Sequence, residues 1–137
     1  MSTKPEVGVA VKDIPKETIL DKDLLYLRVH KANFQREVLN LKVAFANHGA
    51  GMSTDWSKHS TPQKTKDSVT HYGKDPKNYG VLQMNVAKVK NIKGQIVEHT
   101  PRSYNLAHTD VKGEKTQEAL VLFSRIYDWC IKPPKSP

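Results

Sequence analysis

The clearest strand in the sequence is Leu24-Leu25-Tyr26-Leu27-Arg28-Val29-His30, a mainly apolar segment with a polar end. Side chains alternate between the two faces of a strand. Leu25, Leu27 and Val29 are therefore predicted to lie on one face of the strand. The opposite face carries Leu24, Tyr26, Arg28 and His30. We expect Arg28 and His30 to lie on one face near the end of this strand.

Further strands are predicted on both sides of this segment. Apolar residues alternate with small or charged ones from Val7 to Val11, and a period of two also runs from Leu39 to Phe45. Shorter segments at residues 81–85, 95–99 and 106–112 are also predicted to be strands. The first two of these flank a short helix, so they predict a compact strand–helix–strand unit. Its short crossover leaves the strand directions open.

Start and stop signals predict three helices. Thr61 is an N-cap hydroxyl before Pro62, which begins a short, exposed helix. Asn85 can cap a second short helix, with Gly94 at its left-handed end. The strongest helix begins after Thr116 and is ended by two prolines. Its apolar residues recur at helical spacing: Ala119, Leu120, Leu122, Phe123, Ile126, Tyr127 and Cys130.

These elements predict an α+β fold, a single compact domain with a mixed or antiparallel sheet covered by the C-terminal helix. We place the domain at residues 7–131, between a flexible N-terminus at 1–6 and a flexible C-terminal tail at 132–137. The 137 residues, 37% of them hydrophobic, suffice for one core. No apolar run approaches the roughly 20 residues that span a membrane. Because no charged-then-apolar leader opens the chain, we expect a cytoplasmic protein.

The chain is basic, with 22 Lys and Arg against 14 Asp and Glu and a formal net charge of +8. This excess favours an anionic partner, such as nucleic acid. Only four of the cations are Arg, the residue best suited to bidentate phosphate contacts, and the lysines are spread along the chain. A solvated surface without a nucleic-acid partner is the alternative interpretation.

Familiar catalytic and cofactor motifs are absent from the sequence. It has no Gly-x-Gly-x-x-Gly, no phosphate-binding loop ending in Gly-Lys-Ser/Thr, no His-Glu-x-x-His and no Gly-x-Ser-x-Gly. Cys130 is the one cysteine, which excludes an internal disulfide and a Cys-based zinc finger. In the last helix we expect a packed thiol rather than a nucleophile. We therefore predict no cofactor and no bound metal.

Histidines are the most reactive feature of the sequence. His108 and Asp110 are two residues apart, so on a strand they lie on the same face. A carboxylate beside a histidine can fix one tautomer and make the ring a better base or metal ligand. A metal would need a third ligand, such as His30, Glu98 or His99. A hydrogen-bonded structural histidine is the alternative.

Two more places offer binding groups. In the segment Gly49–Trp56, glycines allow a ligand to approach the backbone, and Ser53 and Asp55 lie close to the apolar surface of Trp56. The alternative is an ordinary loop whose tryptophan anchors it to the core. Arg28, at the end of its strand, can pair a phosphate or carboxylate of a ligand, or an acidic residue of the protein.

The same places carry a family resemblance. Leu25-Tyr26-Leu27-Arg28-Val29-His30, Met52-Ser53-Thr54-Asp55-Trp56 and Asn105-Leu106-Ala107-His108 resemble blocks of a family of small uncharacterised bacterial proteins. The family pattern reads approximately LYRRVH, MSVD with Trp sometimes following, and NPAH. Leu27, Thr54 and Leu106 depart from it. The resemblance covers most of residues 24–113 and implies a shared domain, without an activity.

A more distant resemblance is to ADP-ribosyltransferase-like folds, which surround a nicotinamide dinucleotide. It implies Arg28 or His30, Ser53 and Glu98 as the matching positions, although the expected signature around the glutamate is missing. Similarity at the level of a fold does not establish a function.

We favour a ligand-binding or nucleic-acid-binding regulatory module with a polar Arg/His/Ser/Asp site. Its predicted ligand-binding residues are Arg28, His30, Ser53, Asp55, Trp56 and His99. The alternative is a small enzyme, a hydrolase or ADP-ribosyltransferase-like protein. Its candidate catalytic residues are His108 as general base, Asp110 to orient it and Arg28 to stabilise negative charge. A protein-interaction subunit is the third possibility, and it predicts an exposed apolar patch near Trp56 or Trp129.

Overall fold

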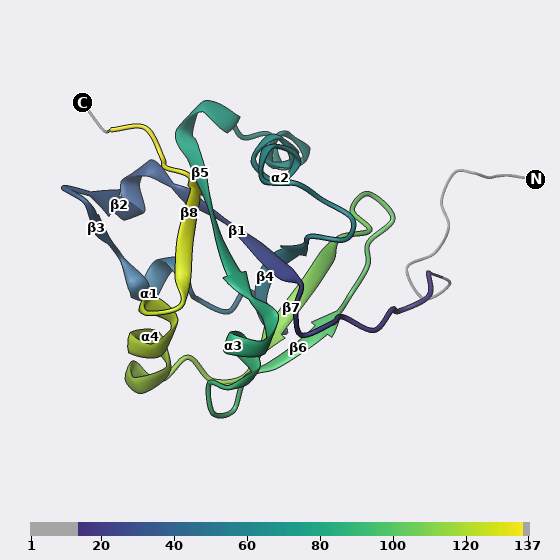
Figure 1. The fold of residues 1–137 in the computed structure, drawn as a ribbon. Coiled ribbons are helices and arrows are strands. Elements are labelled where there is room, and N and C mark those ends of the chain that lie inside the picture. Colours follow the sequence, from purple (N-terminus) through teal and green to yellow (C-terminus); the bar gives the residue numbers. More distant parts are fainter. Residues whose placement is uncertain (1–13, 136–137) are drawn as a thin grey trace, which may run out of the picture.

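A six-stranded sheet dominates the computed structural model, which describes residues 14–135 (Figure 1). In spatial order its strands are β6 (Ile96–His99), β7 (His108–Lys112), β4 (Met52–Trp56), β1 (Leu24–His30), β5 (Tyr79–Asn85) and β8 (Tyr127–Ile131). Every pair of neighbours is antiparallel. This arrangement confirms the α+β prediction and resolves the open strand directions.

Short elements connect these strands. The helices are α1 (Leu41–Ala44), α2 (Pro62–Asp67), α3 (Val86–Lys90) and α4 (Gln117–Ser124). Three 3-10 turns are η2 (Lys31–Asn33), η3 (Ser68–Tyr72) and η4 (Pro76–Asn78). A separate two-stranded ribbon pairs β2 (Phe34–Gln35) with β3 (Val38–Leu39). None of the helices in the described part of the chain is long and apolar enough to cross a membrane.

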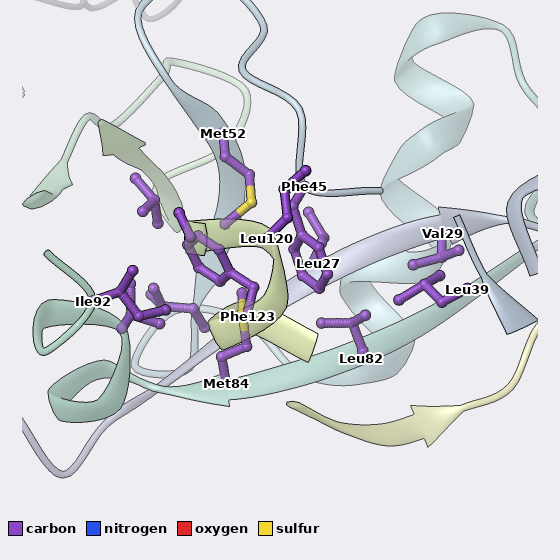
Figure 2. Close-up of a cluster of buried hydrophobic side chains, with 14 of the residues drawn as sticks. Leu27, Val29, Leu39, Phe45, Met52, Leu82, Met84, Ile92, Leu120 and Phe123 are labelled. Atoms are coloured by element: carbon purple, nitrogen blue, oxygen red, sulfur yellow. The ribbon is translucent and has the colours of Figure 1, made fainter. Parts of the chain in front are cut away.

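The core lies on one face of the sheet, under α4 and α1 (Figure 2). The predicted alternation holds in β1, where Leu25, Leu27 and Val29 all face this core. β5 adds Leu82 and Met84 from the neighbouring strand. From α4, the fully buried Phe123 ring stacks on Phe45 with 5.1 Å between the ring centroids. The other face of the sheet is polar, and α2 packs across it.

Local signals for helix starts are confirmed. The Thr61 side chain accepts a hydrogen bond from the Lys64 backbone amide, and Pro62 is the first residue of α2. Asn85 caps α3 in the same way. Gly94 has the predicted left-handed conformation, with φ of 84°, but it lies beyond the end of α3, whose C-cap residue is Asn91. However, α2 is not simply exposed, because its Thr65 side chain is buried against the sheet.

The prediction of a strand from Leu39 to Phe45 is wrong. Leu39 ends β3, and Asn40 then begins α1 by accepting a hydrogen bond from the Val43 backbone amide. An Asn side chain in this position satisfies a free amide at a helix start, so it favours a helical turn over a continued strand.

The C-terminal helix is shorter than predicted. It ends at Ser124, and Tyr127–Ile131 turn back as β8 to pair with β5. The apolar spacing fits a helix. However, the edge of β5 offers backbone hydrogen-bond partners to Tyr127–Ile131, and a longer helix would leave that edge unpaired. Cys130 is therefore a half-buried residue of an edge strand, with Sγ 3.1 Å from Gln83 Oε1.

The strand–helix–strand prediction for residues 81–99 is correct in its elements, but its two strands are not neighbours in the sheet. β5 and β6 are separated in the sheet by β1, β4 and β7. The predicted flexible N-terminus at 1–6 and the strand Val7–Val11 lie outside the described residues. In the predicted C-terminal tail, Pro133 is buried and Lys132 pairs with Glu37 at 2.8 Å.

Truncation of Phe123 tests this account of the core. Phe123→Ala removes a fully buried ring and is expected to lower the free energy of unfolding by about 3–5 kcal/mol. The matched control is Val38→Ala, where the side chain is 67% exposed and the expected change is about 0.5 kcal/mol or less. Urea denaturation measures both. Equal effects of the two substitutions would contradict the core described here.

Candidate functional site

A cavity of about 460 Å³ opens on the polar face of the sheet, beneath α2 and the η3–η4 segment. We call it the Arg28 pocket. It is lined by Tyr26, Arg28, His48, Ser53, Thr54, Asp55, Thr65, Val69, Tyr72, Lys74, Tyr79 and His108. Four of the predicted site residues therefore lie around one space: Arg28, Ser53, Asp55 and His108.

Strand register brings these distant residues together. Tyr26 of β1 lies opposite Asp55 of β4, and Asp55 lies opposite His108 of β7. Residues directly opposite in antiparallel strands project from the same face, so the three side chains form a row across the sheet. Arg28 lies two residues beyond Tyr26 and so shares this face.

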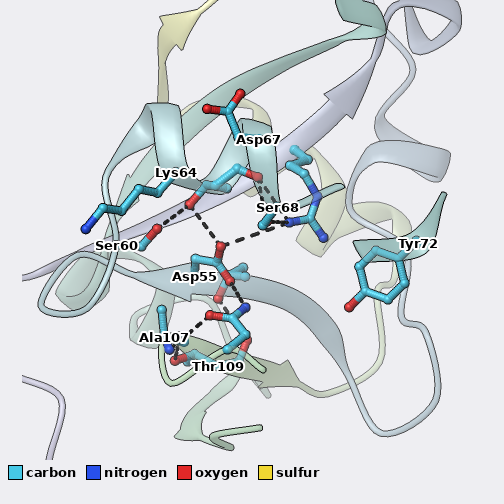
Figure 3. Close-up of polar contacts among 12 residues, drawn as sticks. Asp55, Ser60, Lys64, Asp67, Ser68, Tyr72, Ala107 and Thr109 are labelled. Atoms are coloured by element: carbon cyan, nitrogen blue, oxygen red, sulfur yellow. Dashed lines mark hydrogen bonds and ion pairs between the residues drawn. The ribbon is translucent and has the colours of Figure 1, made fainter. Parts of the chain in front are cut away.

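The Asp55 carboxylate organises the floor of the pocket (Figure 3). It is only 4% exposed and accepts hydrogen bonds from Thr65 Oγ1 at 2.9 Å and Asn105 Nδ2 at 2.8 Å. The Arg28 guanidinium lies 4.0 Å away and supplies a compensating positive charge. Asp55 thereby joins β4 to α2, to β1 and to the β6–β7 loop.

Arg28 is anchored at a single nitrogen. Its Nη1 donates to Ser68 Oγ at 2.8 Å and to the Thr65 carbonyl at 3.2 Å. Its guanidinium carbon lies 5.8 Å from the centre of the Tyr72 ring. Within residues 14–135 its Nε and Nη2 make no hydrogen bond, so these donors can serve a ligand. The predicted ion pair with an acidic residue and a ligand-binding role are thus compatible.

His108 is held by Thr100 rather than by Asp110. Its Nδ1 lies 3.0 Å from the Thr100 carbonyl and 2.9 Å from the Thr100 hydroxyl. A carbonyl can only accept, so Nδ1 carries the proton and Nε2 keeps its lone pair. Burial lowers the pKa of His108, and Arg102 lowers it further, against the opposing effect of Asp110. The ring is therefore a neutral base on the wall of the pocket.

Asp110 shares the face of His108 but does not line the pocket. It lies opposite Ser53 of β4 and Glu98 of β6 and is 4% exposed. Among the described residues its carboxylate has no hydrogen-bond or ion-pair partner, and in particular it makes no hydrogen bond to His108. The predicted Asp110–His108 pair is thus replaced by the contact of His108 with Thr100.

Three predicted ligand-binding residues lie elsewhere. His30 accepts a hydrogen bond from the Ala32 backbone amide and caps η2. Trp56 is buried in the core, where its Nε1 donates to Asp23 Oδ2 at 2.9 Å. His99 packs edge-on against Trp56. The Gly49–Trp56 segment is therefore a loop followed by strand β4, with its tryptophan in the core.

Glu98, the third position in the ADP-ribosyltransferase comparison, also lies outside the Arg28 pocket. It forms ion pairs with Lys16 and Lys112 on the edge strand β6. Hydrogen bonds from Lys112 and Lys16 lower the pKa of Glu98 to about 2. Across the described residues, no group of three or more His, Cys, Asp or Glu side chains is placed to hold a metal ion.

Several pocket residues were missed by the sequence analysis. Thr65, Tyr72, Lys74 and Tyr79 all come from the segment that runs from α2 to the first residue of β5. The Thr61–Pro62 signal located the start of this segment, but a start signal does not show which sheet face a helix covers. No sequence pattern placed Tyr72 beside Arg28.

Comparison with known proteins found no family model, no curated protein and no solved structure that matches the chain. The resemblance to small bacterial proteins stays a prediction.

Replacing Asp55 tests the organising role of its carboxylate. Asp55→Asn removes the negative charge that faces Arg28. It also places an amide NH2 group where a carboxylate oxygen accepts from Thr65 or Asn105. We therefore expect a loss of about 2–3 kcal/mol in the free energy of unfolding. The control is Asp67→Asn, an exposed carboxylate on the same helix–sheet layer, with an expected change of about 0.5 kcal/mol or less. Chemical denaturation compares them. A small effect at Asp55 would show that its network is dispensable.

The protonation state of His108 is testable by NMR. We expect the native ring to carry its proton on Nδ1 and to titrate with a midpoint below 6.5, its ordinary value. Since the unfolded chain then takes up the proton first, stability should fall as pH drops below 6.5. His108→Gln should remove this part of the pH dependence. A proton on Nε2, or a midpoint above 6.5, would refute the assignment.

Proposed function

We propose that the protein binds a small anionic ligand in the Arg28 pocket. The strongest support is the hydrogen bonding of Arg28. Its half-buried guanidinium is fixed by the protein at Nη1, and its Nε and Nη2 donors are not used by the described residues. Such a pre-positioned guanidinium loses little freedom when it pairs a phosphate or carboxylate.

The charges around the cavity support an anion over a cation. Lys74 adds a second positive charge, and Asp55 is the one carboxylate in the lining. That carboxylate is already engaged by Arg28, Thr65 and Asn105. His108 and the Ser53 hydroxyl complete the polar wall, and a neutral imidazole can accept a hydrogen bond from the ligand.

A second candidate function is catalysis with His108 as general base. It is favoured by one observation, the lone pair of Nε2 on a ring that shares the cavity with Arg28. A positioned neutral imidazole can remove a proton, while a guanidinium stabilises the negative charge that develops. Because Asp110 does not orient the ring, this version assigns that role to the Thr100 carbonyl.

Anion binding can be tested with two probes, inorganic phosphate and succinate, followed by 1H–15N NMR. We expect at least one anion to shift the resonances of residues that line the pocket. Arg28→Gln should weaken that binding at least tenfold, and Arg28→Lys should retain part of it, because it keeps the charge but loses the guanidinium geometry. The matched control is Arg125→Gln, which removes the same charge from an exposed position at the end of α4.

The proposal fails if neither anion perturbs the pocket at low salt. It also fails if Arg125→Gln weakens binding as much as Arg28→Gln, since the effect would then report net charge alone. Far-UV circular dichroism of each variant separates loss of binding from loss of fold.

A further inference from the structure

Three aromatic side chains form an exposed cluster at the mouth of the Arg28 pocket. We call His71, Tyr72 and Tyr104 the aromatic rim. The His71 and Tyr104 rings are stacked, with centroids 3.9 Å apart, and Tyr72 stands edge-on to Tyr104. Tyr72 and Tyr104 are each 50% exposed. The rim joins η3 to the β6–β7 loop, and it leaves aromatic surface open to solvent.

A second cavity, of about 330 Å³, lies along the rim. Its lining comprises Arg28, Ser68, Thr70, His71, Tyr72, Tyr104 and Asn105. Arg28 and Tyr72 belong to both cavities, so the guanidinium is reached from the rim as well as from the pocket floor. An anion at Arg28 would therefore lie beside an exposed aromatic surface.

The combination of these groups selects a ligand class. Aromatic side chains stack on planar rings, and a neighbouring Arg pairs a phosphate. Burial raises the pKa of the Tyr72 phenol, as does its hydrogen bond with Tyr104, so Tyr72 stays uncharged and does not repel an anion. Lys74, exposed on the pocket wall, adds a positive charge for the same ligand.

We propose that the aromatic rim and Arg28 together bind a nucleoside phosphate, with the base on the rim and the phosphate at the guanidinium. This rests on the proposed anion site and specifies its ligand. The same chemistry is offered by a free mononucleotide and by a single-stranded nucleic acid. Both present a base and a phosphate to the protein at neighbouring positions.

Calorimetric titration with inorganic phosphate, adenosine 5′-monophosphate and adenosine separates the two contributions. We expect the mononucleotide to bind at least tenfold more tightly than phosphate. Tyr104→Leu should abolish that advantage and leave phosphate binding unchanged, whereas Tyr104→Phe should retain it, because the ring is kept. The matched control is Leu106→Ala, an equally exposed apolar residue of the same loop, which should have no effect.

The outcomes distinguish this inference from the anion site on which it rests. If phosphate binds but the mononucleotide binds no better, or if Tyr104→Leu changes nothing, the rim has no role and the inference fails. If phosphate itself does not bind, the anion site fails. If the rim instead binds only a partner protein, the mononucleotide will bind no more tightly than phosphate, and the inference likewise fails.

A deoxyadenosine decamer distinguishes the two sources of the ligand. Tighter binding than the mononucleotide, with a steep loss of affinity as salt rises, identifies a single strand that makes several phosphate contacts. Affinity equal to that of the mononucleotide, with weak dependence on salt, identifies the free nucleotide. Either result supports the inference when Tyr104→Leu removes the binding advantage.

Discussion

Asp55 places a negative charge in the interior of a small domain, where an unpaired carboxylate would be strongly unfavourable. Hydrogen bonds from Thr65 and Asn105, together with the nearby guanidinium of Arg28, make this charge tolerable. These three partners come from α2, from the β6–β7 loop and from β1. Desolvating one carboxylate therefore requires three separate segments to converge on β4, and their convergence forms the floor of the cavity.

The two faces of the sheet are held by different forces. On one face, α4 and the strands exclude water through apolar packing around Phe123. On the other, α2 is joined to the strands by hydrogen bonds around a cavity. Close apolar packing leaves little room for a ligand, whereas directional polar contacts can hold a helix above an open space. For this reason the binding groups gather on the polar face.

Local signals in the sequence predicted the central strand and the starts of helices α2 and α3. The alternation from Leu25 and the caps at Thr61 and Asn85 depend on nearby residues, and the structure confirms them. Residues Tyr127–Ile131 fit both a helical and a strand period, and only the free edge of β5 decides between them. In the same way, Arg28 lies beside the β4 and β7 side chains because of the register between the strands, and no local sequence pattern specifies that register.

Strand order also has a consequence for biosynthesis. The residues that cover the core and complete the second edge of the sheet, α4 and β8, are translated well after β1 and β5. Until residues 117–131 emerge from the ribosome, Leu82 and Met84 have no helix above them, and β5 lacks its outer neighbour. A nascent chain at that stage presents apolar side chains and an open strand edge, the features that chaperones recognise and that promote aggregation.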